Sequence, residues 1–164
     1  MIVVLGAGAF AAPFASLSQQ KGKVWRVGYL SGGSASPPSG FLQGMRELGY
    51  VEGKNLLIEL RFAEGEYARL AGLAAELVTL KVDVIVTGNA PATSAAQKAT
   101  TTIPVIMGSG GDPVGTGFVK SLAQPGGNIT GLTNIYVELG PKHLEMLLSV
   151  VPRLTRVAFL MNSG

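Results

Sequence analysis

The chain has 164 residues, of which 47% are hydrophobic and 14% charged, and its formal net charge is +3. This composition suits one globular α/β domain and excludes a disordered chain, which is poor in apolar residues and rich in charge. The 13 lysines and arginines are scattered without a run or stripe, which argues against a nucleic-acid partner. The absence of cysteine excludes disulfides and thiol catalysis.

Residues 1–20 differ from the rest because they carry no charge and are dominated by small and apolar residues. Their apolar core, residues 2–14, is shorter than the roughly 20 residues that span a bilayer. The small-x-small pattern Ser16-Leu17-Ser18 resembles a cleavage site, so we expect a secretory signal peptide over residues 1–20. Its positively charged n-region is missing, and the simplest explanation is a start codon placed too far downstream or a truncated gene.

The same segment allows a second interpretation. An apolar run leads into Gly6, Gly8 and Ala11, which matches the G-x-G-x-x-A turn of dinucleotide-binding folds. Pro13 would then lie in the helix that follows, where proline breaks helical hydrogen bonding. No acidic residue ends the next predicted strand, where a ribose contact is needed. We therefore favour the signal peptide and keep the dinucleotide turn as the alternative.

From residue 24 onward, strand-like and helix-like segments alternate along the chain. A buried strand is predicted over residues 24–30, and a helix over residues 40–48, where apolar residues recur at helical spacing. The alternating residues 55–62 predict a half-exposed or edge strand. The remaining predicted elements are a helix over 67–80, a strand over 82–87, a helix over 92–99, a strand over 103–107, a helical turn over 118–122, a strand over 128–132, a helix over 141–150 and a strand over 156–161.

This alternation predicts a three-layer, doubly wound α/β fold with a parallel sheet and right-handed crossovers. In such a sheet the carboxyl ends of all strands lie along one rim, where α/β proteins bind ligands. Four loops are expected on this rim, at residues 31–34, 88–91, 108–114 and from 133 onward.

Two of these loops carry candidate ligand contacts next to a predicted helix start. The loop with Ser31, Gly32 and Gly33 offers N–H groups and hydroxyls that suit an anion such as a carboxylate, or it is a turn that needs glycine for its backbone angles. Gly88 and Asn89 hold the same position after a later strand. Asn89 either contacts a carboxylate or amide of a ligand, or caps the helix that follows.

The loop of residues 108–114 carries the sharpest candidate, Asp112. Its carboxylate either accepts hydrogen bonds from a ligand amine or hydroxyl, or caps a helix that begins with Pro113. Ser109 is a lesser candidate in the same loop. Tyr29 either stacks on an aromatic ligand or packs in the core, and core packing is favoured. Tyr136 is a weaker case of the same kind.

No catalytic constellation stands out in the sequence. His143 is the only histidine and is placed on the solvent side of its helix, without a cluster of carboxylates nearby. No P-loop and no nucleophile elbow is present. We therefore expect no catalytic residue, no metal site and no cofactor, and a binding protein rather than an enzyme.

Several motifs, in a fixed order, resemble the ABC-transporter substrate-binding family, in the branch that includes tryptophan- and tyrosine-binding periplasmic proteins. They lie at residues 27–30, 44–55, 103–106, 112–114, 121–131 and 156–162. The resemblance implies a type I periplasmic-binding fold, with ligand held between two lobes that close by hinge motion. Family members are roughly twice as long. The resemblance thus implies an N-terminal ligand-binding lobe over residues 24–134, then a crossover and the first helix and strand of an incomplete second lobe over residues 135–164.

The function implied by the resemblance is that of an exported, periplasmic or extracytoplasmic, solute-binding component of an ABC import system. It would bind a small polar ligand, an amino acid and in particular an aromatic one, and deliver it to ABC permease membrane subunits. The alternative is a cytoplasmic NAD(P)-dependent oxidoreductase fragment that uses Gly6 and Gly8, and a third hypothesis is a non-functional gene fragment. The residues themselves do not identify the ligand.

Overall fold

The computed structural model describes residues 22–33, 37, 39–134 and 136–158. The expected signal peptide and the alternative dinucleotide turn lie outside the described residues. The elements, in chain order, are β1 (Trp25–Ser31), α1 (Ser39–Glu47), β2 (Leu56–Phe62), the 3-10 helix η1 (Tyr67–Arg69), α2 (Leu70–Thr79), β3 (Val84–Thr87), α3 (Ala90–Ala99), β4 (Val105–Met107), β5 (Ile129–Gly131) and α4 (Tyr136–Val150).

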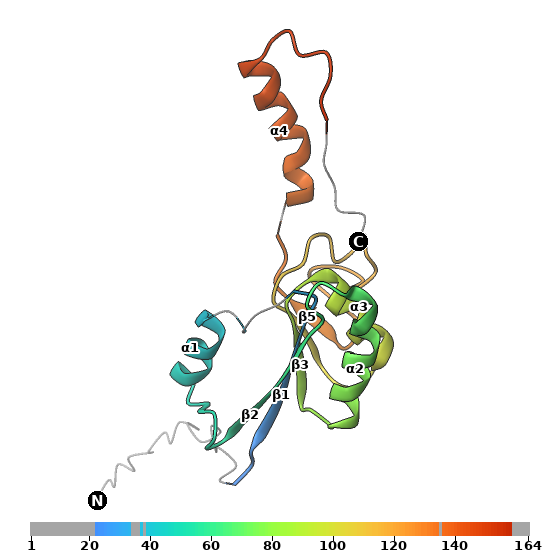
Figure 1. The fold of residues 1–164 in the computed structure, drawn as a ribbon. Coiled ribbons are helices and arrows are strands. Elements are labelled where there is room, and N and C mark those ends of the chain that lie inside the picture. The colour runs from blue at the N-terminus through green and yellow to red at the C-terminus, as the bar shows by residue number, and fades with distance from the viewer. Residues whose placement is uncertain (1–21, 34–36, 38, 135, 159–164) are drawn as a thin grey trace, which may run out of the picture.

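The five strands form one sheet in the order β2-β1-β3-β4-β5, and every neighbouring pair is parallel (Figure 1). The predicted parallel sheet is confirmed, and β2 lies at an edge, as its alternating pattern predicts. From β1 the chain first adds β2 on one side and then returns to add β3 on the other side. The direction of strand addition therefore reverses at the boundary between β1 and β3.

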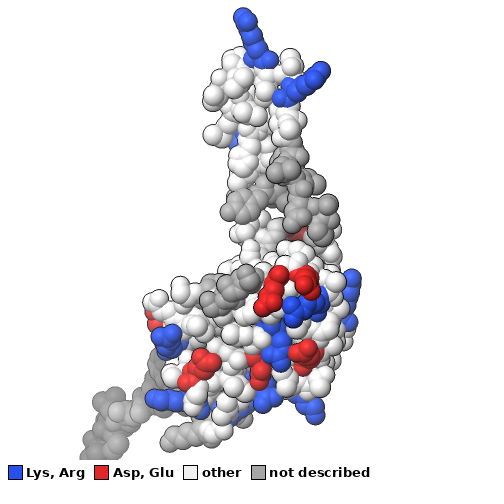
Figure 2. All heavy atoms as spheres, in the orientation of Figure 1, with Lys and Arg blue, Asp and Glu red and all other residues white. Residues whose placement is uncertain are grey.

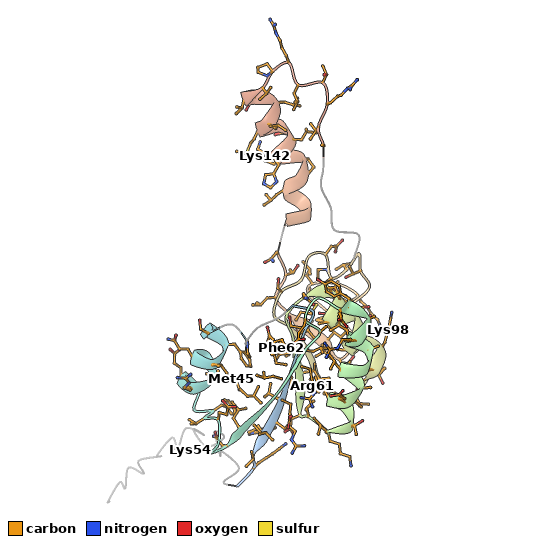
Figure 3. The ribbon with its side chains drawn as sticks, in the orientation of Figure 1. Met45, Lys54, Arg61, Phe62, Lys98 and Lys142 are labelled. Atoms are coloured by element: carbon orange, nitrogen blue, oxygen red, sulfur yellow. The ribbon has the colours of Figure 1, made fainter. Side chains whose placement is uncertain are left out.

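Two apolar clusters cover the two faces of the sheet and make the fold three-layered. On one face α1 packs Phe41 and Met45 against Val27, Tyr29 and other residues of β1 and β2. Met45 and Phe62 belong to this layer (Figure 3). On the other face lie α2 and α3 (Figure 1). They pack against the sheet through a larger cluster, which holds most of the fully buried side chains. Helices on both faces confirm the predicted doubly wound architecture.

The second of these clusters is the main hydrophobic core. Its fully buried residues come from the strands β1, β3 and β4, from the helices α2 and α3, and from the residue that follows β2. They are Leu30, Ala63, Ala74, Leu77, Ile85, Ala92, Ala96 and Val105. Small alanine side chains on α2 and α3 let these two helices approach the sheet and each other closely. This core holds α2 and α3 against β1 and β3. It therefore also determines the positions of the loops that lead into these two helices.

Two of the predicted elements differ from the structure. Residues 118–122 form no helical turn; the turn lies at residues 113–117 instead, because Asp112 caps it and Gly117, with a φ of 73°, ends it. Residues 156–158 form no strand, since no other strand pairs with them in the part of the chain that the structure describes, and residues 159–161 lie outside that part.

Helix α4 begins at Tyr136, earlier than the predicted residue 141, and carries Pro141 inside it. The helix projects away from the sheet (Figure 1) and makes no extended contact with another described element. Its apolar side chains, such as Leu144 and Met146, are exposed. No helix within residues 22–33, 39–134 and 136–158 is both long and apolar enough to cross a membrane.

Candidate functional site

The carboxyl ends of β1 and β3 lie side by side where the direction of strand addition reverses. In open α/β sheets, the loops that leave the sheet on either side of this point diverge and leave a crevice, which is the usual place of a ligand. The loop after β1 contains Gly32, and the loop after β3 contains Gly88 and Asn89. The strand order thus brings together two loops that the sequence placed only somewhere on a common rim.

Close contacts explain the glycines in these two loops. A Cβ atom on Gly32 would overlap the ring of Tyr67 and would lie 2.9 Å from Nδ2 of Asn89. A Cβ atom on Gly88 would lie 2.8 Å from Oη of Tyr29 and 2.9 Å from Oγ of Ser31. Neither glycine has a positive φ. The idea that the turn needs glycine for its backbone angles is therefore wrong here: the side chains of neighbouring elements approach the bare backbone.

Ser31 and Gly32, at the end of β1, accept hydrogen bonds from the loop after β2. The N–H of Ala63 donates to the carbonyl of Ser31 at 2.9 Å, and the N–H of Gly65 donates to the carbonyl of Gly32 at 2.8 Å. Oγ of Ser31 accepts a long hydrogen bond from the N–H of Gly33 at 3.4 Å. These bonds position Ser31 and Gly32 before any ligand arrives, which lowers the entropic cost of ordering them on binding.

Asn89 is the N-cap of α3, as one of the two interpretations predicts. Its Oδ1 accepts a hydrogen bond from the N–H of Ala92 at 3.1 Å, which satisfies one of the orphan donors of the helix. The cap occupies the side-chain oxygen and leaves Nδ2 directed toward Gly32. The helix cap predicted for Asn89 is therefore confirmed, and the same side chain places Nδ2 next to Gly32.

Asp112 caps the turn that follows it. Its Oδ1 accepts hydrogen bonds from the N–H groups of Val114 at 3.1 Å and Gly115 at 2.8 Å. Pro113 follows at the first position of the turn and is buried, whereas Asp112 is exposed. The capping geometry predicted for this pair is therefore present, and the carboxyl group of Asp112 is exposed at the rim.

The loop with Ser109 is tied to the segment that leaves β5. Nδ2 of Asn134 donates to Oγ of Ser109 at 3.3 Å, and the N–H of Asn134 donates to the carbonyl of Gly110 at 2.7 Å. Oγ1 of Thr133 donates to the carbonyl of Gly111. The sequence places residue 133 on the rim but gives no signal for Asn134, because amide–hydroxyl contacts 25 residues apart leave no local pattern.

The remaining sequence candidates lie in the core or on α4. The ring of Tyr29 packs 6.2 Å from the ring of Phe41 and 5.9 Å from that of Phe62 (centroid distances), which confirms core packing. Burial raises the pKa of its hydroxyl. His143 is exposed on α4, and the side chain of Tyr136 lies outside the described residues. Within the described residues, no group of three or more acidic or histidine side chains is placed to hold a metal ion.

A hollow of about 350 Å³ lies elsewhere, between the edge strand β2 and α2. It is lined by Arg61, Gly72, Ala75, Glu76, Thr79 and Leu80. Nε of Arg61 pairs with Oε2 of Glu76 at 2.7 Å, so its two charged side chains neutralise each other. None of these residues belongs to the rim loops. The hollow is therefore a surface feature beside an ion pair, separate from the rim loops.

The family model for ABC transporter substrate-binding proteins matches residues 32–164. The chain belongs to this family. The matched region contains every candidate ligand residue except Ser31, and it contains none of the N-terminal residues on which the oxidoreductase alternative depends. The family is one of substrate-binding transport proteins rather than enzymes.

Acidic and basic side chains are intermixed on the face of the sheet domain shown in Figure 2.

Similar proteins support the same assignment. A tyrosine-binding protein from Clostridioides difficile is 34% identical over 125 residues, which are 76% of this chain and 36% of that protein. The crystal structure of a conserved domain protein from Vibrio cholerae matches with a TM-score of 0.71 and 34% identity, over 80% of this chain and 45% of the other. An ABC domain from Streptococcus pneumoniae in complex with L-Trp matches with a TM-score of 0.61 and 32% identity, over 68% of this chain and 39% of the other.

A ligand-free, open substrate-binding protein from Clostridium difficile matches with a TM-score of 0.66 and 27% identity, over 75% of this chain and 43% of the other. The α/β fold is therefore that of substrate-binding proteins, as the sequence predicts. The chain spans between 36% and 45% of the length of these four relatives.

Proposed function

We propose that this protein is the exported solute-binding component of an ABC import system, and that its ligand is an amino acid with an aromatic side chain. The observation that carries the proposal is the pair of loops beside the β1–β3 boundary, where Nδ2 of Asn89 lies against the backbone of Gly32. The ligand class rests on two relatives, one named as tyrosine-binding and one solved with L-Trp.

The proposed binding surface comprises both rim clusters. We assign ligand contacts to Ser31, Gly32, Gly33, Gly88, Asn89, Ser109, Asp112 and Pro113. In this arrangement Nδ2 of Asn89 donates to the ligand carboxylate, and the carboxylate of Asp112 attracts the ligand ammonium group. An α-amino acid carries both groups, so a neutral amide donor and a carboxylate on the same rim suit it. Binding is non-covalent and needs no cofactor.

The proposed domain organisation follows the family resemblance. Residues 1–20 act as a signal peptide, residues 24–134 form the ligand-binding lobe, and residues 135–164 begin a second lobe. The exposed apolar face of α4 supports this division, because a helix with such a face is stable mainly when it packs against another element. The ligand would be enclosed between the lobes and delivered to permease subunits in the membrane.

An NMR titration of the ¹⁵N-labelled 164-residue chain tests the ligand proposal. One wall of a cleft binds weakly, so we expect dissociation constants on the order of 1 mM for L-Trp, L-Tyr and L-Phe. The amide signals of Gly32, Gly33 and Asn89 should shift, while that of Asp83, at the opposite end of the sheet, should not. The proposal is wrong if none of the three amino acids shifts the amide signals of the rim residues at a concentration 20-fold above the expected dissociation constant.

Export is tested separately with residues 1–20 fused to a reporter enzyme that folds only outside the cytoplasm. The expected result is reporter activity, because the apolar segment would direct secretion. A matched fusion in which Leu5 is replaced by aspartate should be inactive, since a charge interrupts the apolar region. An inactive parent fusion, or full activity of the aspartate variant, would contradict the signal peptide.

A further inference from the structure

Tyr67 is an aromatic residue at the rim that the sequence patterns assign only to the start of a helix. It opens η1, directly after the loop that follows β2. Its exposed fraction is 39%, and it belongs to neither apolar cluster, unlike Tyr29. The ring lies against the bare backbone of Gly32, because a Cβ atom there would overlap it. A large ring is thus held against Gly32 at the carboxyl rim of the sheet without being buried in the core.

The backbone before Tyr67 is bent so that its ring reaches Gly32. Glu64 and Gly65 both have left-handed conformations, with φ of 55° and 87°. A residue other than glycine in this conformation costs about 1 kcal/mol. The N–H of Gly65 donates to the carbonyl of Gly32 at 2.8 Å, and the N–H of Tyr67 donates to the carbonyl of Gly65 at 3.2 Å. A strained turn and two hydrogen bonds therefore connect Tyr67 to the loop after β1.

Asn89 lies at the same glycine as the ring. Its Nδ2 would be 2.9 Å from a Cβ on Gly32, and its Oδ1 is occupied by the helix cap. The backbone of Gly32 is therefore flanked by an aromatic ring and by an amide donor. An aromatic ring favours planar ligand groups, since offset-stacked and edge-to-face contacts between rings add to the free energy of burial. The amide donor favours a carboxylate.

We propose that Tyr67 is a specificity-determining residue, whose ring contacts the side chain of the ligand and makes the crevice prefer aromatic over aliphatic amino acids. This inference rests on the proposed function, since it names the part of the site that recognises the ligand side chain. Tyr67 acts by direct contact, whereas Gly32 acts by leaving room for the ring.

The experiment compares the wild-type chain with Tyr67→Leu and Tyr67→Phe, using NMR titrations with L-Trp, L-Phe and L-Leu. Replacing the ring by an aliphatic side chain should weaken L-Trp and L-Phe binding about 2- to 10-fold and change L-Leu binding less than 2-fold. Tyr67→Phe keeps the ring and should bind all three ligands within 2-fold of wild type. Amide spectra of both variants should otherwise overlay on the wild-type spectrum.

The other outcomes separate this inference from the proposed function. If the wild-type chain binds none of the three amino acids, the proposed function fails. If the wild type binds L-Trp and Tyr67→Leu binds it equally well, the role of Tyr67 is wrong while the function stands. An equal loss of all three ligands in Tyr67→Leu would show a structural role only and would also overturn the inference.

Discussion

The two ends of the sheet use their polar groups in different ways. At the amino end, the carboxylate of Asp83 accepts hydrogen bonds from the N–H of Arg26 and from Nζ of Lys23, both at 2.8 Å. Nζ of Lys23 also lies 3.7 Å from the ring centroid of Trp25. At the carboxyl end, Asn89 and Asp112 each cap a short segment with one oxygen and keep further polar atoms at the rim.

The difference shows how polar groups are divided between stability and binding. The polar groups of the amino end are hydrogen-bonded to one another, so a ligand would have to break these hydrogen bonds before it could bind there. The groups of the carboxyl end serve their caps and still place an amide donor next to Gly32 and a carboxylate at the exposed rim. Substitutions at the two ends should therefore have different effects. Those at the amino end should change the free energy of unfolding, and those at the carboxyl end should change the affinity for the ligand.

The largest expected effect is that of Asn89→Asp. Aspartate caps helices as well as asparagine does, so stability should stay within about 0.5 kcal/mol. It replaces the amide donor with a negative charge that repels a ligand carboxylate, which should cost at least about 2 kcal/mol, or roughly 30-fold in affinity. NMR titration with L-Trp measures the change. Asn89→Ser keeps a cap without the charge and should lose less; unchanged binding by the aspartate variant would contradict the assigned contact.

The next largest effect is that of Asp83→Ala. Removing the carboxylate takes away the partner of the Arg26 N–H and of the Lys23 ammonium group. Because the site is partly open to solvent, the loss in free energy of unfolding should be about 1.5 kcal/mol. Urea denaturation measures it as a lower midpoint at constant m-value. Amino-acid affinity should not change, and a clear loss of affinity would break the proposed division between the two ends.

Asp112→Asn should have a smaller effect on binding. Asparagine accepts the same capping hydrogen bonds, so stability should hardly change. Loss of the negative charge should weaken the attraction for a ligand ammonium group by about 1 kcal/mol, or roughly fivefold. Asp112→Ala is the matched comparison: it should lose the same affinity and about 1 kcal/mol of stability through the missing cap. Equal affinity of the asparagine variant and wild type would remove Asp112 from the ligand site.

The smallest expected effect concerns pH. The backbone N–H of Arg26 and the ammonium group of Lys23 hold the pKa of Asp83 below its ordinary value of 3.8. A carboxyl group whose pKa is lowered by folding stabilises the folded state above its unfolded pKa, and this contribution is lost as pH falls through the folded pKa. As the pH is lowered below about 4, the free energy of unfolding should therefore decrease less in Asp83→Asn than in wild type. Thermal unfolding between pH 6 and pH 3 checks the difference.

Much of the fold is encoded in local patterns. The alternation of Leu57, Glu59 and Arg61 with apolar residues predicts a strand that is exposed on one side, and β2 lies at the sheet edge. The helical spacing of apolar residues predicts α1 and α2. These predictions succeed because the repeat of a strand or helix is set by the backbone of the segment itself. Asp112 and Pro113 predict a cap, although the turn that they start replaces the one expected at residues 118–122.

The contacts that make the candidate site could not be predicted in this way. Tyr67 meets Gly32, and Asn89 meets the same glycine, across long separations in the chain. The contact depends on the position of β1 between β2 and β3 and on the turn at Glu64 and Gly65. Nor does a pattern around Asn134 indicate that its amide bonds to Ser109.

The sequence by itself determined the alternation of strands and helices, the parallel sheet, the family, and the rim on which the candidate residues lie. Periodicity, caps and short motifs are properties of neighbouring residues, so they can be read before the chain folds. Only the tertiary structure decided that the loops after β1, β2 and β3 converge on Gly32, and that Tyr67 and Asn89 flank it. The packing of α2 and α3 on the sheet brings these loops together, and packing between distant segments leaves no local pattern in the chain.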